Sequence, residues 1–306
     1  MDLTQKPASH FEIHSHDGSL SAVISKYGGT ILSLTAHGFN FLDGDEPDDP
    51  VSSARGQLLF PWPNRIDGGR YNFMGIEYQL PINEVATGNA IHGFVRNMTF
   101  SADRILPDLL VLNSQIGPQP GYPFEFAIKV SYKIIDSGVK IAFEVANLGI
   151  EPMPIGLGLH PYLRIDGQGI DSWELKINAE DYLEVNSRSI PISWKSVDAS
   201  RFDFREFRKI SSTVLDTCLK KSIGANNQLA TLKSPLRRVI VSASEHFNYV
   251  QLYSGDTVGD SFRRRKSLAI EPMSCPPNSF NTGESLVTLD PGRVWQSWVK
   301  IECFLE

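Results

Sequence analysis

The chain has 306 residues, of which 41% are hydrophobic and 21% are charged, and its formal net charge is −6. These proportions are typical of a globular protein with a full core, and the acidic balance argues against a nucleic-acid or anionic-membrane partner, since both bind basic surfaces. The three cysteines are too few and too scattered for a disulfide framework or a paired CxxC metal site. The first residues carry no signal-peptide pattern and no segment is apolar enough to span a bilayer, so we expect a cytoplasmic protein.

Alternating apolar and polar residues recur along the chain and predict β-strands. In the clearest example, Phe126, Ile128 and Val130 point to one face of a run that ends at Ile134. A second alternating run follows after Asp136-Ser137-Gly138, which is typical of a hairpin turn. The strand runs, in chain order, are 21–25, 72–80 (with a turn at Gly75), 126–134, 139–147, 172–177, 237–244, 249–254 and 295–304.

Helical periodicity is scarce. Residues 203–221 are the best candidate for a short helix. The chain has no internal repeat and no proline-rich linker, so we expect a single all-β domain over residues 1–306. Its architecture is predicted to be a large antiparallel sandwich with few short helices.

Four stretches place polar residues within this β-rich pattern, namely 60–71, 89–97, 156–163 and 268–281. In the first, two prolines fix the backbone ahead of Asn64 and Arg65, and Trp62 offers a flat apolar surface. Sugars bind to such sites by stacking on an aromatic ring while planar polar groups bind the hydroxyls. The alternative for Arg65 is a surface arginine in a turn.

The other stretches carry His92, His160 and Glu271. Each histidine has the alternative of a buried ring that is hydrogen-bonded to the backbone. Glu271 ends the apolar run SLAIE, and an unpaired buried carboxylate is costly. It therefore has either a structural partner, such as Arg65, or a chemical role. A carboxylate and a histidine in one cleft form a base and an acid whose pKa values shift toward neutrality.

A metal-dependent β-barrel of the cupin type is a rival interpretation. His10, His14 and His16 lie near the start of the chain, and the last two would share a strand face. Cupins need a glutamate a few residues later, which residues 17–22 lack. An exposed polar strand is the better interpretation, and we expect no metal.

Taken in order, the polar stretches resemble the aldose 1-epimerase (galactose mutarotase-like) family. No single motif is specific, but the ordered set is. Gly93-Phe94 and Leu163-Arg164 depart from the usual galactose enzymes and resemble divergent bacterial branches. The matching motifs are Tyr27-Gly28-Gly29, Asn64-Arg65-Ile66, Gly69-Arg70-Tyr71, Tyr78-Gln79-Leu80, Ile91-His92-Gly93, His160-Pro161-Tyr162, Leu215-Asp216, Gln251-Leu252-Tyr253, Ala269-Ile270-Glu271-Pro272, Asn281 and Asp290-Pro291-Gly292.

The resemblance implies a β-supersandwich and cofactor-independent interconversion of the α and β anomers of a free aldose. Glu271 resembles the general base that takes the proton of the C1 hydroxyl, and His160 resembles the general acid that protonates the ring oxygen. The partner is then a small sugar, and the protein a monomer or homodimer. The residues expected to bind the sugar are Arg65, His92, Asp216, Asn64, Trp62 and Tyr162.

Two alternatives stay open at this point. One is a mutarotase for hexose 6-phosphates, for which the cluster Arg263-Arg264-Arg265-Lys266 would bind the phosphate; a solvated basic loop is the simpler interpretation. The other is a sugar-binding or regulatory protein that has kept the fold without the catalysis. Retention of both His160 and Glu271 argues against the second.

Overall fold

The computed structural model describes residues 9–46, 52–222, 224 and 226–306. Strands form nearly all of its regular structure, and every pairing between the named strands is antiparallel. The predicted all-β antiparallel class is therefore confirmed.

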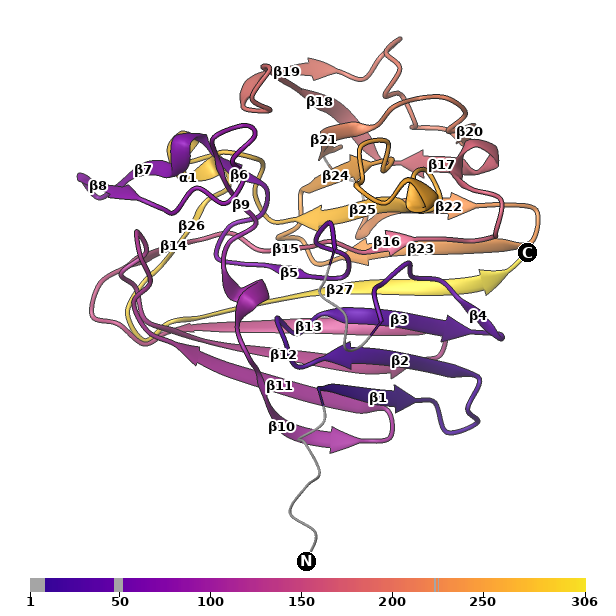
Figure 1. The fold of residues 1–306 in the computed structure, drawn as a ribbon, viewed down its shortest axis with the longest axis horizontal. Helices are drawn as coiled ribbons and strands as arrows, with labels where there is room; N and C mark the ends of the chain where they lie inside the picture. Colours follow the sequence, from indigo (N-terminus) through magenta and orange to yellow (C-terminus); the bar gives the residue numbers. More distant parts are fainter. Residues whose placement is uncertain (1–8, 47–51, 223, 225) are drawn as a thin grey trace, which may run out of the picture.

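The largest sheet has nine strands and contains the predicted hairpin (Figure 1). Ile134 pairs with Val139 beside the turn, and Phe126, Ile128 and Val130 are fully buried on the core face. The alternation of side chains with period two explains this one-sided burial. In sheet order the strands are β10 (Ser101–Leu106), β11 (Leu109–Ile116), β12 (Phe126–Ile135), β13 (Gly138–Asn147), β27 (Val294–Leu305), β23 (Arg237–Ala243), β22 (Gln228–Lys233), β17 (Glu174–Ile177) and β20 (Arg208–Lys209).

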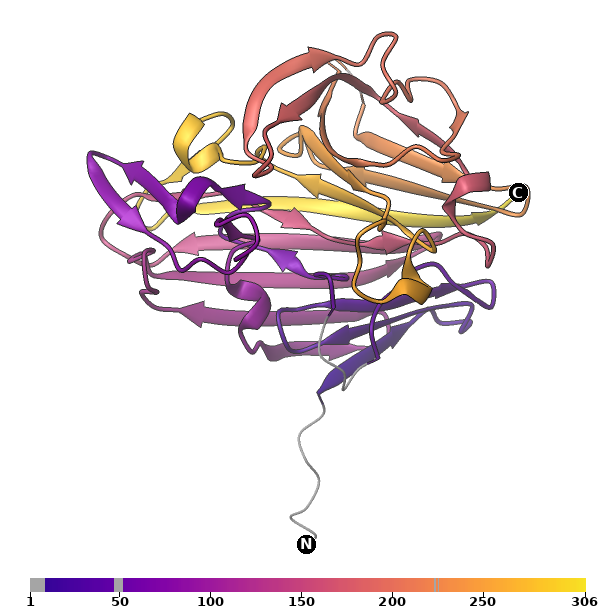
Figure 2. The same cartoon turned by 45° about the horizontal axis from the view of Figure 1, so that its top comes forward.

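A second sheet of eight strands lies in front of the upper part of the first (Figures 1 and 2). It carries Tyr162, Asp216 and Glu271, and His160 directly follows one of its strands. Its order is β19 (Pro191–Ser196), β18 (Ala179–Val185), β21 (Asp216–Lys221), β24 (Tyr249–Tyr253), β25 (Leu268–Met273), β15 (Gly158–Leu159) and β5 (Leu58–Leu59), with β16 (Tyr162–Leu163) also paired to β25.

A four-stranded sheet covers the lower part of the large sheet and contacts β11, β12 and β13 (Figure 1). Its strands are β1 (His10–His14), β2 (Leu20–Ser25), β3 (Ile31–Ala36) and β4 (Phe39–Asn40). Because β1 is an edge strand, His14 on it is exposed, and so is His16, which lies beyond its end. The cupin interpretation is not supported by this placement.

Three two-stranded ribbons and five short helical turns complete the described structure. The turn predicted at Gly75 joins the strands of one ribbon. The ribbons are β14 (Met153–Ile155) with β26 (Val287–Leu289), β6 (Arg65–Ile66) with β9 (Ala90–Ile91), and β7 (Arg70–Phe73) with β8 (Ile76–Gln79). The helical elements are η1 (Asp67–Gly69), η2 (Val95–Asn97), η3 (Ile170–Ser172), η4 (Ser261–Arg263) and α1 (Ser279–Thr282).

The helix predicted over 203–221 is wrong. This segment forms β20, a turn and then β21. Thr217, Cys218 and Leu219 are buried in succession, so both faces of β21 are covered along this part of the strand. A strand buried on both faces loses its alternation, so its sequence is easily taken for a helix. Among the described residues, no helix has the length and apolar character needed to cross a membrane.

Candidate active site

A polar cavity of about 540 Å³ opens between the eight-stranded sheet and the β6–β9 ribbon. Its volume is in the range of sites that hold a small molecule. Adjacent strands of the sheet provide one side, and the turns at the ends of β6 and β9 provide another. The lining includes all but one of the expected site residues: Asn64, Arg65, His92, His160, Tyr162, Asp216 and Glu271.

Glu271 lies at the floor of this cavity, in the middle of β25 and opposite Gln251 of β24. It is 2% exposed, and its Oε1 lies 3.2 Å from Nε2 of His160. Its Oε2 has no hydrogen-bond partner in the described part of the chain. Burial raises the pKa of Glu271 well above its ordinary value, the nearby Asp216 raises it further, and Arg65 opposes the shift.

His160 follows β15 and is held there by its own backbone. Its N–H donates to the carbonyl of Gln57, and its carbonyl accepts the N–H of Gly56. The imidazole is parallel to the ring of Tyr162, with the ring centroids 5.1 Å apart. Burial lowers the pKa of His160. With Glu271 shifted the opposite way, the two buried groups favour their uncharged forms and share one proton.

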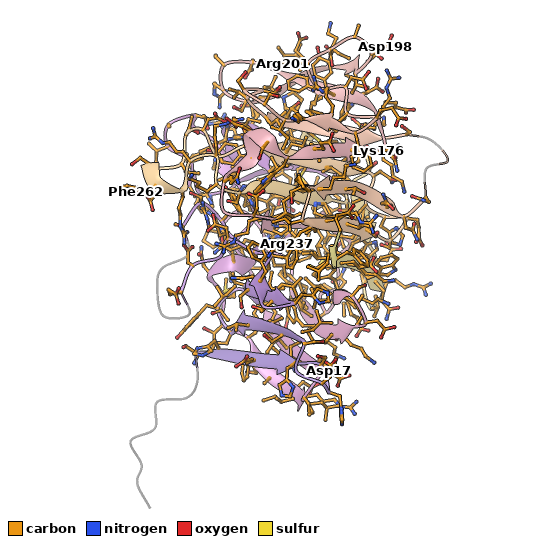
Figure 3. The ribbon with its side chains drawn as sticks, turned by 90° about the vertical axis from the view of Figure 1, so that its right-hand side faces the viewer. Asp17, Lys176, Asp198, Arg201, Arg237 and Phe262 are labelled. Carbon is orange, nitrogen blue, oxygen red and sulfur yellow. The ribbon has the colours of Figure 1, made fainter. Side chains whose placement is uncertain are left out.

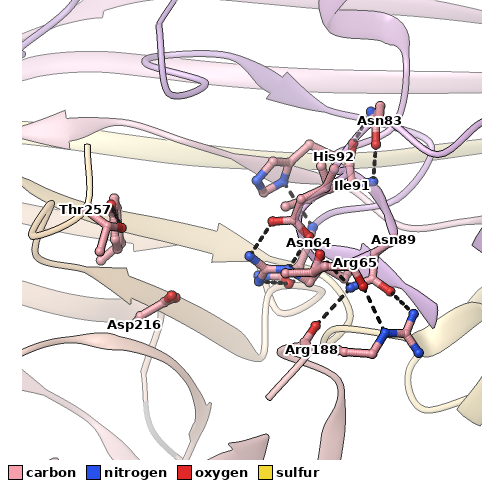
Figure 4. Close-up of polar contacts among 12 residues, drawn as sticks. Asn64, Arg65, Asn83, Asn89, Ile91, His92, Arg188, Asp216 and Thr257 are labelled. Carbon is pink, nitrogen blue, oxygen red and sulfur yellow. Dashed lines mark hydrogen bonds and ion pairs between the residues drawn. The ribbon is translucent and has the colours of Figure 1, made fainter. Parts of the chain in front are cut away.

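The second histidine, His92, has a fixed tautomer. The backbone N–H of Asn64 donates to its Nδ1 at 3.2 Å, and the N–H of His92 donates back to the carbonyl of Asn64 (Figure 4). Both residues have positive φ, 54° and 63°, an uncommon backbone conformation that clusters at functional sites. Burial lowers the pKa of His92 well below its ordinary value, so the ring is neutral and Nε2 carries the hydrogen.

Arg65 is held by Glu84, a residue that the sequence analysis did not single out. The Nε and Nη2 atoms of Arg65 donate to the two carboxylate oxygens of Glu84 at 2.8 and 2.7 Å. Burial opposes the charge of Arg65, but the hydrogen bonds to Glu84 outweigh it and raise the arginine's pKa. Because Arg65 pairs with Glu84, it is not the structural partner of Glu271. Its Nη1 lies 3.4 Å from Oδ1 of Asn64.

Asp216 begins β21 and lies apart from the cluster of Asn64, Arg65 and His92 (Figure 4). Its Oδ1 accepts a hydrogen bond from Nε2 of Gln251 at 2.8 Å. Asp216 faces the open pocket and is exposed there, while the surrounding walls raise the pKa of its carboxyl. The carboxylate of Asp216 and the side-chain amide of Gln251 thus lie side by side at the wall of the cavity, and both are planar groups that can hydrogen-bond to a ligand.

The three buried groups His92, His160 and Glu271 place possible metal ligands within 4.8 Å of one another. The tautomer of His92 does not fit a metal, because the nitrogen that faces away from Asn64 carries the hydrogen. Two ligands are then left, fewer than zinc sites use. The chemistry of this set is proton donation and acceptance.

Trp62 is the one expected sugar contact that the structure does not place at the cavity, so that expectation is wrong. Its indole is 4% exposed and packs edge-on against Phe94 and Phe280. An aromatic ring between two prolines has the same sequence pattern whether it faces a pocket or the core. Tyr162, in contrast, lines the cavity and contacts His160.

The three arginines of the basic cluster 263–266 bond to other residues of the protein. Arg263 pairs with Asp45, and Arg265 pairs with Asp171 and Asp256. Nε of Arg264 donates to the carbonyl of Val258. These bonds anchor the loop that lines the cavity with residues 257–259, whereas its Phe262 points into solvent and is 88% exposed (Figure 3). Arg263 and Arg265 are held in ion pairs within the protein, which does not support the phosphate site, whereas Arg264 and Lys266 are exposed, as the solvated-loop interpretation expects.

Arg96 is a further cavity residue that sequence reasoning missed. It is half-buried on η2, its Nε has no hydrogen-bond partner, and no ion pair to it occurs among the described residues. Burial lowers its pKa. Arg96 falls four residues after His92 in the polar stretch 89–97, and this position was the one sequence feature that pointed to it. No sequence feature pointed to Glu84, because only folding brings it next to Arg65.

The antiparallel β fold holds a buried carboxylate–imidazole pair at the base of a polar cavity, an arrangement that can donate protons to a small molecule and accept them from it. The family model of aldose 1-epimerase matches residues 12–302. The chain is 31% identical over 296 residues to the uncharacterized protein YihR of Escherichia coli (strain K12), covering 96% of this chain and 93% of that one. The chain therefore belongs to the aldose 1-epimerase family.

Other relatives agree with this membership. The galactose mutarotase of Mus musculus is 29% identical over 66% of this chain and 65% of its own length. Among solved structures, a GalM/aldose epimerase homologue from C. elegans superimposes with a TM-score of 0.88 at 21% identity, covering 98% and 99% of the two chains. The galactose 1-epimerase of Lactobacillus acidophilus gives a TM-score of 0.81 at 18% identity over 95% and 93%. These structures establish the galactose mutarotase-like fold that the sequence predicts.

Proposed function

We propose that this protein is a cofactor-independent mutarotase that interconverts the α and β anomers of an aldose. The observation that carries the proposal is the pair of Glu271 and His160, 3.2 Å apart and buried at the floor of a polar cavity. A protein that only binds sugar has no need for a buried carboxylate with one oxygen left without a hydrogen-bond partner in the described structure, since such a group is costly.

In the proposed reaction the sugar lies over the pair, with its C1 hydroxyl at Glu271 and its ring oxygen at His160. Glu271, as a carboxylate, takes the proton of the C1 hydroxyl while His160, as an imidazolium, gives its proton to the ring oxygen. The bond between C1 and the ring oxygen breaks, and an open-chain aldehyde forms. Rotation about the C1–C2 bond followed by the reverse proton transfers closes the ring on the other face. The catalyst ends as it began.

The electrostatics of the pair favour the ring-opening half of this cycle. Ring opening converts a carboxylate and an imidazolium into a carboxylic acid and a neutral imidazole. Burial favours the second state, because it raises the pKa of Glu271 and lowers that of His160. Ring closure restores the charges while the aldehyde is consumed. Nε2–H of His92 is available to donate a hydrogen bond to the sugar near its ring oxygen. The sugar hydroxyls are proposed to bind to Arg65 and to the neighbouring side chains of Asp216 and Gln251.

The proposal is tested by magnetisation transfer between the α and β C1 protons of equilibrated sugars. The panel contains glucose, galactose, xylose, arabinose, rhamnose and fucose. Exchange faster than in buffer for at least one sugar is expected, and each acid–base group contributes about 10²–10⁴-fold. Binding without faster exchange for any sugar would instead indicate a sugar-binding protein of the same fold.

Arg96 supports a second candidate, a mutarotase for aldoses that carry an anionic group such as a 6-phosphate. A half-buried guanidinium without an ion-pair partner among the described residues, at the edge of the cavity, favours an anion there. The test adds glucose 6-phosphate and glucuronate to the panel and compares wild type with Arg96→Met. A loss of exchange confined to the anionic sugars would support this candidate, and an equal loss for glucose would contradict it.

A further inference from the structure

A buried cation lies close to His160 in the fold. Arg55 is 1% exposed, and its guanidinium carbon lies 4.2 Å from the centroid of the Tyr162 ring. That ring is parallel to the imidazole of His160 to within 13°. The ring of Tyr162 therefore contacts both the guanidinium and the imidazole.

The charge of Arg55 is only partly compensated. Its Nε lies 3.4 Å from Oδ2 of Asp43, and its Nη2 has no hydrogen-bond partner among the described residues. Asp43 also accepts a hydrogen bond from the hydroxyl of Ser267 at 2.7 Å. Arginine–carboxylate pairs are frequently bidentate, whereas Arg55 makes a single long contact to Asp43 through Nε, so its charge is less well compensated than in a bidentate pair.

The backbone around Arg55 is shaped to place it there. Ser53 and Ala54 have φ values of 50° and 58°, which residues with a side chain rarely adopt. Gly56 has φ 68°, and a Cβ atom there would lie 1.9 Å from the carbonyl oxygen of Ile31. The same Gly56 donates its N–H to the carbonyl of His160. Strained backbone that persists in a fold points to a function for the residue it positions.

We propose that Arg55 is a positioning residue that acts through Tyr162 on His160, holding the plane of the imidazole and making the imidazolium a stronger acid toward the ring oxygen. This inference rests on the proposed role of His160 in proton transfer. Arg55 does not line the cavity, so it reaches the sugar only through its neighbours.

The electrostatics agree with this geometry. After burial, the charges of Arg55 and Arg96 lower the pKa of His160. An ionised Glu271 acts in the opposite sense, because it favours the imidazolium. The titratable and charged groups that face His160 are Glu271 from β25, His92 from the end of β9, Tyr162 from β16, Arg96 from η2 and Arg55 from the segment before β5.

The test is a ¹⁵N NMR titration of the His160 imidazole in the unliganded protein, with the signal assigned by its loss in His160→Ala. Arg55→Gln keeps a planar group and removes the charge, and it is expected to raise the midpoint by about one pH unit. Arg55→Lys keeps the charge and is expected to leave the midpoint in place. A midpoint unchanged in Arg55→Gln overturns the proposal.

Arg237→Met is the control. The guanidinium carbon of Arg237 lies 4.0 Å from the ring centroid of Phe39, outside the cavity, and its Nε, like Nη2 of Arg55, is buried without a hydrogen-bond partner among the described residues. This variant is expected to leave both the midpoint and the exchange rate unchanged. If Arg55→Gln does not fold, Arg55→Lys decides: a kcat lowered about tenfold with KM unchanged is expected, and an unchanged kcat overturns the proposal. The titration of His160 does not depend on turnover. A protein that fails the anomeric-exchange test can therefore still show whether Arg55 acts on His160.

Discussion

At the residue scale, Glu271 is held in a state that is unfavourable for the folded protein. It is fully buried, its nearest polar partner is a histidine whose own charge is disfavoured, and one of its oxygens has no partner among the described residues. Catalytic groups of this kind commonly lower stability, because the site that raises their reactivity also desolvates their charge. Stability and activity are therefore expected to separate at this position.

Glu271→Gln is expected to increase thermal stability at pH 7. The pKa of Glu271 is raised in the folded state, so between the unfolded and folded pKa values the folded protein binds more protons and its stability falls as pH rises. Glutamine has no proton to lose, so the variant avoids this loss of stability. Its gain in stability over wild type should be complete above the folded pKa of Glu271 and should vanish below about pH 4, near the pKa of an unfolded glutamate. Melting curves from pH 4 to pH 8 measure it, and a variant less stable than wild type at pH 7 would contradict it.

At the scale of elements, the site is assembled from neighbouring strands and two turns. Strands β24 and β25 place Gln251 opposite Glu271, and on β21 Asp216 lies opposite Tyr253, two residues along β24 from Gln251. The β6–β9 ribbon places Asn64 and His92 so that their backbones bond to each other. Glu84 then fixes Arg65 by two short hydrogen bonds. In the proposed mechanism the ribbon supplies sugar-binding groups, whereas the sheet carries the groups that transfer protons.

Glu84→Gln is expected to raise KM about tenfold with a smaller change in kcat. It removes one of the two charge-assisted hydrogen bonds that hold Arg65, worth about 1.5–3 kcal/mol when the partner is charged. Arg65 is proposed to bind the sugar equally before and during the reaction, so the loss falls on KM. Glu206→Gln is the control, since Glu206 is 89% exposed in its pair with Lys176. A large loss of kcat at unchanged KM would rule out this role.

Some site residues could be predicted from the sequence and others could not. His160 and Glu271 stood out because each is a titratable group in an apolar run, and the ordered motifs placed them in one family. Trp62 was misassigned because nothing local distinguishes a core face from a pocket face. Glu84 and Arg55 were not found because their roles depend on partners, Arg65 and Tyr162, that only folding brings together.

At the scale of the whole molecule, one extended apolar cluster joins buried residues of the nine-, eight- and four-stranded sheets. Strands predicted from alternation of period two were found because one face is buried and the other is not. The centre of the eight-stranded sheet was missed at β21, where both faces are covered. A single domain over residues 1–306 and a monomeric or homodimeric state stay predictions.

Ile128→Ala is expected to cost about 2–5 kcal/mol of unfolding free energy, because Ile128 is fully buried on β12 and its truncation leaves a cavity. It is outside the candidate site, so kcat and KM of the folded variant should equal those of wild type. Ile150→Ala, at a residue that is 89% exposed, is the control and should change stability by less than about 0.5 kcal/mol. Denaturant unfolding of both variants checks this, and equal costs would contradict the burial seen for β12.

The most direct test of proton transfer by the buried pair is a comparison of binding and anomeric exchange in Glu271→Gln. With the sugar that wild type turns over best, magnetisation transfer gives the exchange rate and line broadening gives the affinity in the same sample. We predict an exchange rate lowered by about 10²–10⁴-fold with affinity retained. An exchange rate equal to that of wild type would contradict the central role of Glu271, and an equal loss of affinity and exchange would assign it to binding or to structure.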